Sequence, residues 1–364
     1  MTRYDIAIVG AGMAGASLAA AVAPHASVVL LEAEELPGYH ATGRSAAFWS
    51  ESYGGPGVQP LTTASGAALR DGGFLEDLGS LHIGRAQDET AITDFLAEFA
   101  GSGVELQQVD PRTYIPGLRA EWTLGVMEQS STYIDVAGLH ARYLADARRA
   151  GAMLMLSAPL HAATHMGDRW QIMTGAGAVS ATILVNAAGA WADEVARRAD
   201  VAPIGITAYR RTVVQLLTDP APPATMPHIA DIAGNFYFKP EAGGRLWLSP
   251  HDETKVEPGD VQPEEIDVAT AIDRFEHVVD WRITKLERRW AGLRSFAPDR
   301  LPVYGFAPDS PGFFWCAGQG GFGIQTAPAA AALAAAVLLG LAPDESVAGI
   351  DPARYAPGRF HALA

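Results

Sequence analysis

A short apolar strand that runs directly into a glycine-rich turn limits what this chain can fold into more than any other feature. Residues 4–9 read Tyr-Asp-Ile-Ala-Ile-Val, and residues 10–15 read Gly-Ala-Gly-Met-Ala-Gly ahead of an alanine-rich helical stretch. Gly10 permits a tight turn, Gly12 lets the backbone approach a pyrophosphate, and Gly15 lets helix and strand pack closely. The pattern predicts a parallel α/β sheet that binds a dinucleotide at the N-terminus of the first helix.

A second apolar strand follows at residues 27–31 and ends at an acidic side chain. Glu32 lies about 20 residues beyond the first glycine, where such a side chain accepts hydrogen bonds from a ribose. A phosphate on that ribose would require a basic neighbour, whereas the next residues are Ala33, Glu34 and Glu35. The motif therefore disfavours NADP and leaves FAD and NAD open.

The size and charge of the chain exclude several classes of partner. With 364 residues it exceeds what one hydrophobic core usually supports, which predicts two subdomains. The net charge of −15 disfavours nucleic acid and anionic membrane surfaces, because both are polyanions. The sole cysteine, Cys316, excludes an internal disulfide and a cysteine-rich metal site and fits a reducing, cytoplasmic compartment. No pair of histidines has metal-ligand spacing with a neighbouring acid, so we expect no metal centre.

Apolar segments of the chain are too short to predict a membrane span. The longest covers residues 327–342, fewer than the ~20 residues that cross a bilayer. We expect no transmembrane segment, and peripheral contact with a membrane stays open.

Three separated segments share the pattern of a buried strand that ends in a glycine turn. They begin at residue 4, at residues 181–186 and at residues 313–317, and the last leads to a helix near Thr326. The intervening segments carry short alternating patterns typical of antiparallel strands. We therefore predict a Rossmann-like α/β domain, formed by residues 1–78, 141–205 and 291–364, with an inserted antiparallel-sheet substrate-binding domain, formed by residues 79–140 and 206–290.

Six motifs together resemble one enzyme family. They are the glycine turn at 10–15, Glu32, the small-residue segment at 38–47, and the segments at 185–191, 290–296 and 319–326. In this order they are similar to the D-amino-acid oxidase superfamily of FAD enzymes, and within it to the D-arginine dehydrogenases. The resemblance implies FAD bound without a covalent link, since no matching position offers a cysteine.

The resemblance also implies which residues contact the cofactor. Residues 43–46 would lie along the flavin ring, and Gly189 and Trp191 would border it. A helix beginning near Thr326, with Pro328 in its first turn, would direct its positive end at the reduced flavin. The implied set is Gly10, Gly12, Met13, Ala14, Gly15, Glu32, Ala33, Gly43, Arg44, Ser45, Ala46, Ala188, Gly189, Trp191, Gly320, Gly321, Phe322, Gly323, Ile324 and Gln325.

Substrate binding is implied for five positions, of which Gln325 also belongs to the cofactor set. Arginine matches a carboxylate with its planar fork, and the resemblance assigns this task to Arg211, rather than its neighbour Arg210, and to Arg294. Tyr53 and Tyr237 would close over the substrate and bond its carboxylate. Residues 318–321 would offer backbone carbonyls to the amine, with Gln325 close by.

Two departures from the D-arginine dehydrogenases bear on the side chain of the substrate. Those enzymes hold a guanidinium with an acid where this chain has Ser80, and they carry a histidine where it has Phe48. An unpaired guanidinium in a less polar pocket is costly, so we predict an apolar or aromatic side chain instead of arginine.

The leading hypothesis is an FAD-dependent D-amino-acid dehydrogenase or oxidase. It transfers hydride to flavin N5 and gives an imino acid, which water hydrolyses to a 2-oxo acid and ammonia. Alternatives are oxidation of an N-methyl or cyclic secondary amino acid or a 2-hydroxy acid, and a flavin-carrying subunit of a larger redox complex. A plain NAD dehydrogenase leaves the motifs at 43–45 and 320–321 unexplained. The electron acceptor and the oligomeric state stay open.

Overall fold

The opening strand, turn and helix form as predicted in the computed structural model, which describes residues 1–363 and their side chains through Phe360. β1 (Thr2–Val9) leads into α1 (Met13–Val22) and then β2 (Val28–Leu31), which pairs in parallel with β1. Gly10 has a φ of +100°, and a Cβ on it would lie 2.5 Å from the Ala187 carbonyl oxygen. A Cβ on Gly15 would lie 1.8 Å from the Gly10 carbonyl oxygen. Neither position admits a side chain.

An eight-stranded sheet is built around β1. Its order is β10-β11-β12-β1-β2-β9, with β20 pairing β12 and β19 pairing β20. The added strands are β9 (Met153–Met155), β10 (Leu160–Met166), β11 (Arg169–Thr174), β12 (Gly177–Asn186), β19 (Val303–Phe306) and β20 (Phe313–Ala317). Because β1, β2, β12 and β20 run in parallel, the turns that follow them meet at one edge of the sheet.

Side chains of β1 alternate between the two faces of this sheet. Ile6 and Ile8 pack toward α1 and α7, whereas Ala7 and Val9 pack toward α5. The helices that surround this sheet are α4 (Val136–Arg149), α5 (Ala192–Arg198) and α7 (Ala327–Leu339). Both faces of the sheet are buried, as expected of a largely parallel sheet.

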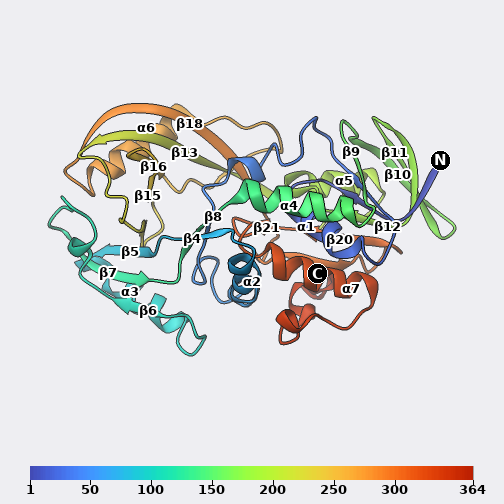
Figure 1. The fold of residues 1–364 in the computed structure, drawn as a ribbon, viewed down its shortest axis with the longest axis horizontal. Helices are drawn as coiled ribbons and strands as arrows, with labels where there is room; N and C mark the ends of the chain where they lie inside the picture. The colour runs from blue at the N-terminus through green and yellow to red at the C-terminus, as the bar shows by residue number, and fades with distance from the viewer. Residues whose placement is uncertain (364) are drawn as a thin grey trace.

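A ten-stranded sheet forms the second lobe (Figure 1). Its order is β21-β18-β13-β16-β15-β14-β5-β7-β6, with β17 beside β13, and only β14 and β5 run in parallel. The strands are β5 (Ser80–Arg85), β6 (Leu106–Gln108), β7 (Trp122–Glu128), β13 (Thr207–Asp219), β14 (His228–Asp231), β15 (Tyr237–Glu241), β16 (Arg245–Ser249), β17 (Thr254–Lys255), β18 (Arg282–Phe296) and β21 (Gln319–Gly320). α6 (Glu265–Glu276) packs on this sheet and α3 (Glu89–Glu98) lies beside β5 and β7.

A three-stranded sheet and one helix complete the fold. The strands, in the order β3-β8-β4, are β3 (Phe48–Trp49), β8 (Thr132–Ile134) and β4 (Leu75–Asp77), and the helix is α2 (Gln59–Asp71). In the described part of the chain no helix is long and apolar enough to cross a membrane. β18 continues without a break across residues 290 and 291, between which one domain boundary was expected. The expected division into two domains stays a prediction.

Candidate active site

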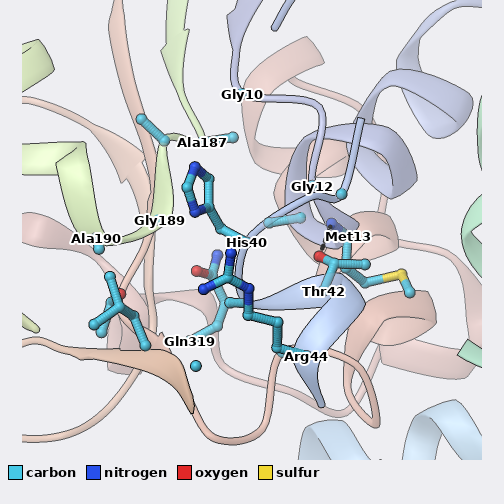
Figure 2. A pocket seen from close by; sticks show the side chains of 18 of the residues that line it. Gly10, Gly12, Met13, His40, Thr42, Arg44, Ala187, Gly189, Ala190 and Gln319 are labelled. Atoms are coloured by element: carbon cyan, nitrogen blue, oxygen red, sulfur yellow. Dashed lines mark hydrogen bonds between the residues drawn. The ribbon is translucent and has the colours of Figure 1, made fainter. Parts of the chain in front are cut away.

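A cavity of about 430 Å³ begins at the converging turns of the first sheet and reaches the second sheet. Its lining includes the turn at Gly10 and Gly12, residues 38–42 and 44–48, and residues of β13, β15 and β18. Figure 2 shows the side chain of His40 between the Gly10–Gly12 turn and the turn at Ala187 and Gly189. The cavity therefore joins the predicted dinucleotide motif to the predicted substrate residues.

Glu32 is fixed at the nucleotide end of the cavity. Its Oε2 accepts a hydrogen bond from the Ala11 N–H at 2.8 Å, and its Oε1 accepts one from the Glu34 N–H at 3.0 Å. These bonds hold the carboxylate against the glycine turn. At the start of α1 the Met13 N–H donates to Thr42 Oγ1 at 3.0 Å, so residue 42 closes over the N-terminus of this helix.

Seventeen of the 20 residues expected to contact the cofactor line the cavity. The exceptions are Gly15, Gly43 and Phe322. A Cβ on Gly43 would lie 2.8 Å from the Gly38 carbonyl oxygen, so this glycine serves a close backbone contact, as Gly15 does. The ring of Phe322 lies 5.0 Å from that of Tyr53 and supports it from behind. Contact of these residues with the cofactor stays a prediction.

The Arg44 side chain bridges the two halves of the molecule. Its guanidinium donates to Asp260 Oδ1 at 2.6 Å and to the carbonyl oxygens of Val261 and Ala291 at 3.2 and 3.3 Å. The Tyr39 hydroxyl donates to the same carboxylate at 3.2 Å. These contacts hold the pKa of Asp260 below its usual value. Sequence reasoning did not find Asp260, because it lies more than 200 positions from Arg44 and carries no motif.

The start of α7 differs from the expectation that its N–H groups face the cavity. The Ala327 N–H donates to the Ile324 carbonyl oxygen at 3.2 Å, and the Ala329 N–H donates to Ser65 Oγ at 3.1 Å. Pro328 has no N–H. The cavity is lined instead by the preceding turn at residues 319–325.

Two arginines and a tyrosine with unused donors meet at the other end of the cavity. Arg211 is 4% exposed, and its Nε donates to the Asp252 carbonyl oxygen at 2.8 Å while its Nη2 donates to Glu253 at 3.3 Å. Its Nη1 and the Tyr53 hydroxyl are buried and have no partner among the described residues. The Arg294 side chain forms no hydrogen bond or ion pair among the described residues, and its guanidinium carbon lies 5.7 Å from the centre of the Tyr53 ring.

Gly321 brings Tyr53 and Arg294 together. A Cβ at this position would lie 2.4 Å from the Tyr53 hydroxyl oxygen and 3.0 Å from Arg294 Cζ. Both polar groups therefore converge on the backbone of the 319–325 turn, which only a residue without a side chain leaves clear.

The electrostatics of this end favour an anion. Burial, with the charge of Arg294 beside it, lowers the pKa of Arg211 to about 10, which leaves it charged at neutral pH. Burial and the same two guanidinium charges lower the pKa of His251 to about 3. Arg211 already pairs with Glu253, whereas Arg294 has no acidic partner among the described residues, so the cavity holds one unpaired cation beside the free Nη1 of Arg211. A planar carboxylate matches both the charge and the geometry of these donors.

Arg210 points away from the cavity, because successive residues of a strand face opposite sides of a sheet. Its guanidinium contacts Glu264 and, at 2.8 Å, Asp267. Arg211 thus lines the cavity and Arg210 does not, and the carboxylate role assigned to Arg211 stays a prediction.

An aromatic wall borders the same end. The Phe48 ring lies 5.2 Å from that of Tyr53 and 6.5 Å from that of Tyr237, and all three residues line the cavity. Behind Phe48 the His228 ring follows at 4.3 Å, and its Nδ1 lies 3.1 Å from Ser80 Oγ. Burial holds the pKa of His228 well below its usual value, so this layer carries no charge.

Gln325 lines the cavity but its amide is committed to protein groups. Its Nε2 donates to the Tyr53 carbonyl oxygen at 3.0 Å and to Thr62 Oγ1 at 2.9 Å, and its Oε1 accepts from the Ser50 N–H at 3.3 Å. A direct role of this side chain toward substrate stays a prediction.

Comparison with known families decides the class of protein. The family model DAO, described as FAD dependent oxidoreductase, matches residues 5–337. The chain belongs to this family. Two curated relatives are the mitochondrial dimethylglycine dehydrogenase of Homo sapiens, 27% identical over 273 residues, and the hydrogen cyanide synthase subunit HcnC of Pseudomonas aeruginosa, 27% identical over 224 residues. These matches cover 67% and 60% of this chain but 30% and 50% of the relatives, so the chain spans half or less of their length.

Solved structures of other proteins share the fold of this DAO-family chain. Glycine oxidase from Geobacillus kaustophilus superimposes with a TM-score of 0.82 at 21% identity and covers 96% of this chain and 98% of its own. L-proline dehydrogenase from P. horikoshii has a TM-score of 0.85 at 19% identity and covers 100% and 99%.

FAD is the cofactor of this DAO-family oxidoreductase, and the cavity fits it. Glu32 would bind the ribose, the Gly10–Met13 turn would hold the pyrophosphate, and Gly189 with residues 319–325 would border the ring system. Cys316 is buried away from the cavity lining, and burial raises the pKa of its thiol to about 12, so it offers no thiolate for a covalent link.

Proposed function

We propose that this oxidoreductase oxidises a small α-amino acid whose carboxylate binds between Arg211, Arg294 and Tyr53. One observation supports this above all others. The Arg211 Nη1 and the Tyr53 hydroxyl are buried polar atoms without partners, in a cavity that also holds the unpaired Arg294. Leaving such donors unsatisfied is costly, and a carboxylate would satisfy both at once.

Bound FAD supplies the hydride acceptor for this chemistry. The residues of the chain hold the substrate by its carboxylate, which fixes the orientation of the α-carbon. Backbone carbonyls of the turn at residues 319–321 would accept hydrogen bonds from the amine, and the rings of Phe48 and Tyr237 would exclude water. Loss of hydride from the α-carbon and of a proton from nitrogen gives an imino acid, which water hydrolyses to a 2-oxo acid and ammonia.

Among amino acids we propose the D isomer with an apolar or aromatic side chain. Phe48, Tyr53 and Tyr237 present rings to the cavity, and the layer behind them is the uncharged pair of His228 and Ser80. No carboxylate in the described lining lies beside this wall, so a guanidinium there would have no counter-ion. This composition supports the proposal against D-arginine, despite the motif resemblance to the D-arginine dehydrogenases.

An N-methyl or cyclic secondary amino acid is the second candidate. The names of the dimethylglycine dehydrogenase and L-proline dehydrogenase relatives favour it, and the same carboxylate site would serve. A flavin-carrying subunit of a larger complex is the third, because HcnC is itself named a subunit and the chain spans half of it.

The test is anaerobic reduction of the purified, FAD-loaded protein, followed by bleaching of the flavin absorption band. Each amino acid is paired with the amine that lacks its carboxylate, such as D-phenylalanine with phenethylamine. L isomers, N-methylglycine, proline and 2-hydroxy acids complete the panel. Bleaching by apolar D-amino acids, at least ~100-fold faster than by the paired amines, is expected because the amines lose the charged contacts. Equal rates for acid and amine would refute the carboxylate site.

A further inference from the structure

We infer that Glu128 is a positioning residue for Tyr53, holding the turn at residues 50–53 so that the tyrosine hydroxyl faces the substrate. Glu128 is the last residue of β7 in the second sheet and does not line the cavity. The inference rests on the proposed function, in which the Tyr53 hydroxyl binds the substrate carboxylate.

Three consecutive residues before Tyr53 donate to this one carboxylate. Glu128 Oε2 accepts from Ser50 Oγ at 2.8 Å and from Ser52 Oγ, and its Oε1 accepts from the Glu51 N–H at 2.6 Å. The Glu128 side chain is fully buried, and within the described residues no cation contacts it. The hydrogen bonds that this carboxylate accepts therefore all come from residues of the turn.

Gln325 holds the same turn from the opposite side. Its amide bonds the Ser50 N–H and the Tyr53 carbonyl oxygen, as described above. The turn closes on itself through the Tyr53 N–H and the Ser50 carbonyl oxygen at 3.3 Å. The backbone on both sides of the Tyr53 Cα is thus tied to the cofactor turn and to the substrate sheet together.

Burying a carboxylate costs free energy, and this cost is offset best when all of its acceptor positions receive hydrogen bonds. A buried acid without a cation loses its hydration, and burial raises the pKa of Glu128 while the three donors oppose that rise. A glutamine would offer one acceptor oxygen in place of two, so at least one of the three donors would lose its partner. Holding three adjacent donors at once is what this acid does that its amide cannot.

The result of this anchoring is a phenol fixed with its hydroxyl unpaired. The Tyr53 ring is packed between Phe48 and Phe322, at 5.2 and 5.0 Å, and it leaves its hydroxyl near Gly321 and Arg294. Pre-positioning of this kind lowers the ordering cost of substrate binding. Loss of Glu128 should therefore weaken binding through Tyr53 and not independently of it.

The experiment is a double-mutant cycle on the FAD-loaded protein. Glu128→Gln and Tyr53→Phe are made singly and together, and anaerobic flavin reduction gives the substrate Kd and the limiting rate. The Kd is expected to rise about three- to tenfold for Glu128→Gln, and less than about twofold when the same change is made in Tyr53→Phe. The limiting rate should change less than the Kd, because a carboxylate contact binds ground state and transition state alike.

Asp231→Asn is the matched control. Asp231 is also a buried carboxylate that accepts three hydrogen bonds from a turn, those from the Ala233 N–H, the Asn235 N–H and Asn235 Nδ2, and it does not line the cavity. Any effect it has on Kd should be the same with and without the Tyr53 hydroxyl. An equal effect of Glu128→Gln in both backgrounds, or none in either, overturns the inference.

A second measurement does not depend on the substrate. Hydrogen–deuterium exchange of the peptide spanning residues 48–55 should be faster in Glu128→Gln than in the parent protein and unchanged in Asp231→Asn. Ser52→Ala, which removes one donor only, should give an intermediate rate and serves if Glu128→Gln folds poorly. Unchanged exchange in both Glu128→Gln and Ser52→Ala overturns the anchoring itself. Faster exchange in a protein that no amino acid reduces means that the proposed function fails while the anchoring stands.

Discussion

Replacing Arg211 by lysine tests the proposed anion site with the charge retained. The three donor nitrogens of Arg211 have three separate directions: Nε to the Asp252 carbonyl oxygen, Nη2 to Glu253, and Nη1 to the cavity. A lysine has a single ammonium group and cannot serve all three. We expect it to stay with the fixed acceptors at Asp252 and Glu253 and to leave the substrate with one charged contact fewer.

The size of the effect follows from that single contact. A hydrogen bond between charged partners contributes about 1.5–3 kcal/mol, which corresponds to a rise in substrate Kd of roughly 10- to 150-fold. Arg210→Lys is the matched control, because Arg210 is equally buried on the same strand and also pairs with acids, but outside the cavity. Both variants lose stability, whereas only the Arg211 variant should lose affinity.

The assay is anaerobic stopped-flow reduction of the flavin over a range of substrate concentrations. The Arg211→Lys variant should saturate at higher concentration with a limiting rate within about threefold of the parent, as expected when a contact common to ground and transition states is removed. Flavin content and the unfolding midpoint are measured for both variants. Equal rises in Kd for the two arginines, or a rise below threefold for Arg211→Lys, would show that the free Nη1 does not bind the substrate.

Three further predictions concern the cofactor end and the core. Gly15→Ala should abolish FAD retention, since its Cβ would lie 1.8 Å from a backbone carbonyl oxygen, whereas Gly349→Ala, with no atom within 4 Å, should keep the parent flavin-to-protein absorbance ratio. Asp260→Asn removes the partner of two cavity-lining side chains and should speed FAD loss on dilution about two- to fivefold, with Asp344→Asn, an exposed acid bonded only to its own turn, as the control. Cys316 should react with iodoacetamide at pH 8 only as fast as the protein unfolds, because burial raises its pKa to about 12; labelling in seconds without denaturant would contradict the buried position.

Local patterns in the sequence were enough to predict the parts of the fold that local physics determines. β1, the glycine turn and α1 follow from residue types within about 20 positions, and α7 begins at Ala327, one residue after the expected Thr326. The choice of Arg211 over Arg210 agrees with strand alternation in the structure, although its role in binding stays a prediction. The family and its cofactor, FAD, were likewise inferred correctly from the motifs.

Contacts between distant segments could not be predicted in this way. Ser50 and Glu128 are 78 positions apart, and Arg44 and Asp260 are 216 apart. No periodicity links such pairs, since they meet only because the second sheet packs over the turns of the first. The donors at the start of α7 were misjudged for the same reason, because Ser65 reaches the Ala329 N–H from α2, a different helix.

Arg211 and Arg294 stand on neighbouring strands, β13 and β18, which pair along the whole length of β13. Their separation is therefore set by a backbone ladder, whereas Phe48 and Tyr53 sit on a two-residue strand and a turn. If the proposed carboxylate site holds, exchange of Phe48 can admit another side chain while Arg211 and Arg294 keep their places on the ladder. A fixed pair of arginines beside an exchangeable wall residue would let one scaffold adapt to many amino acids by few substitutions.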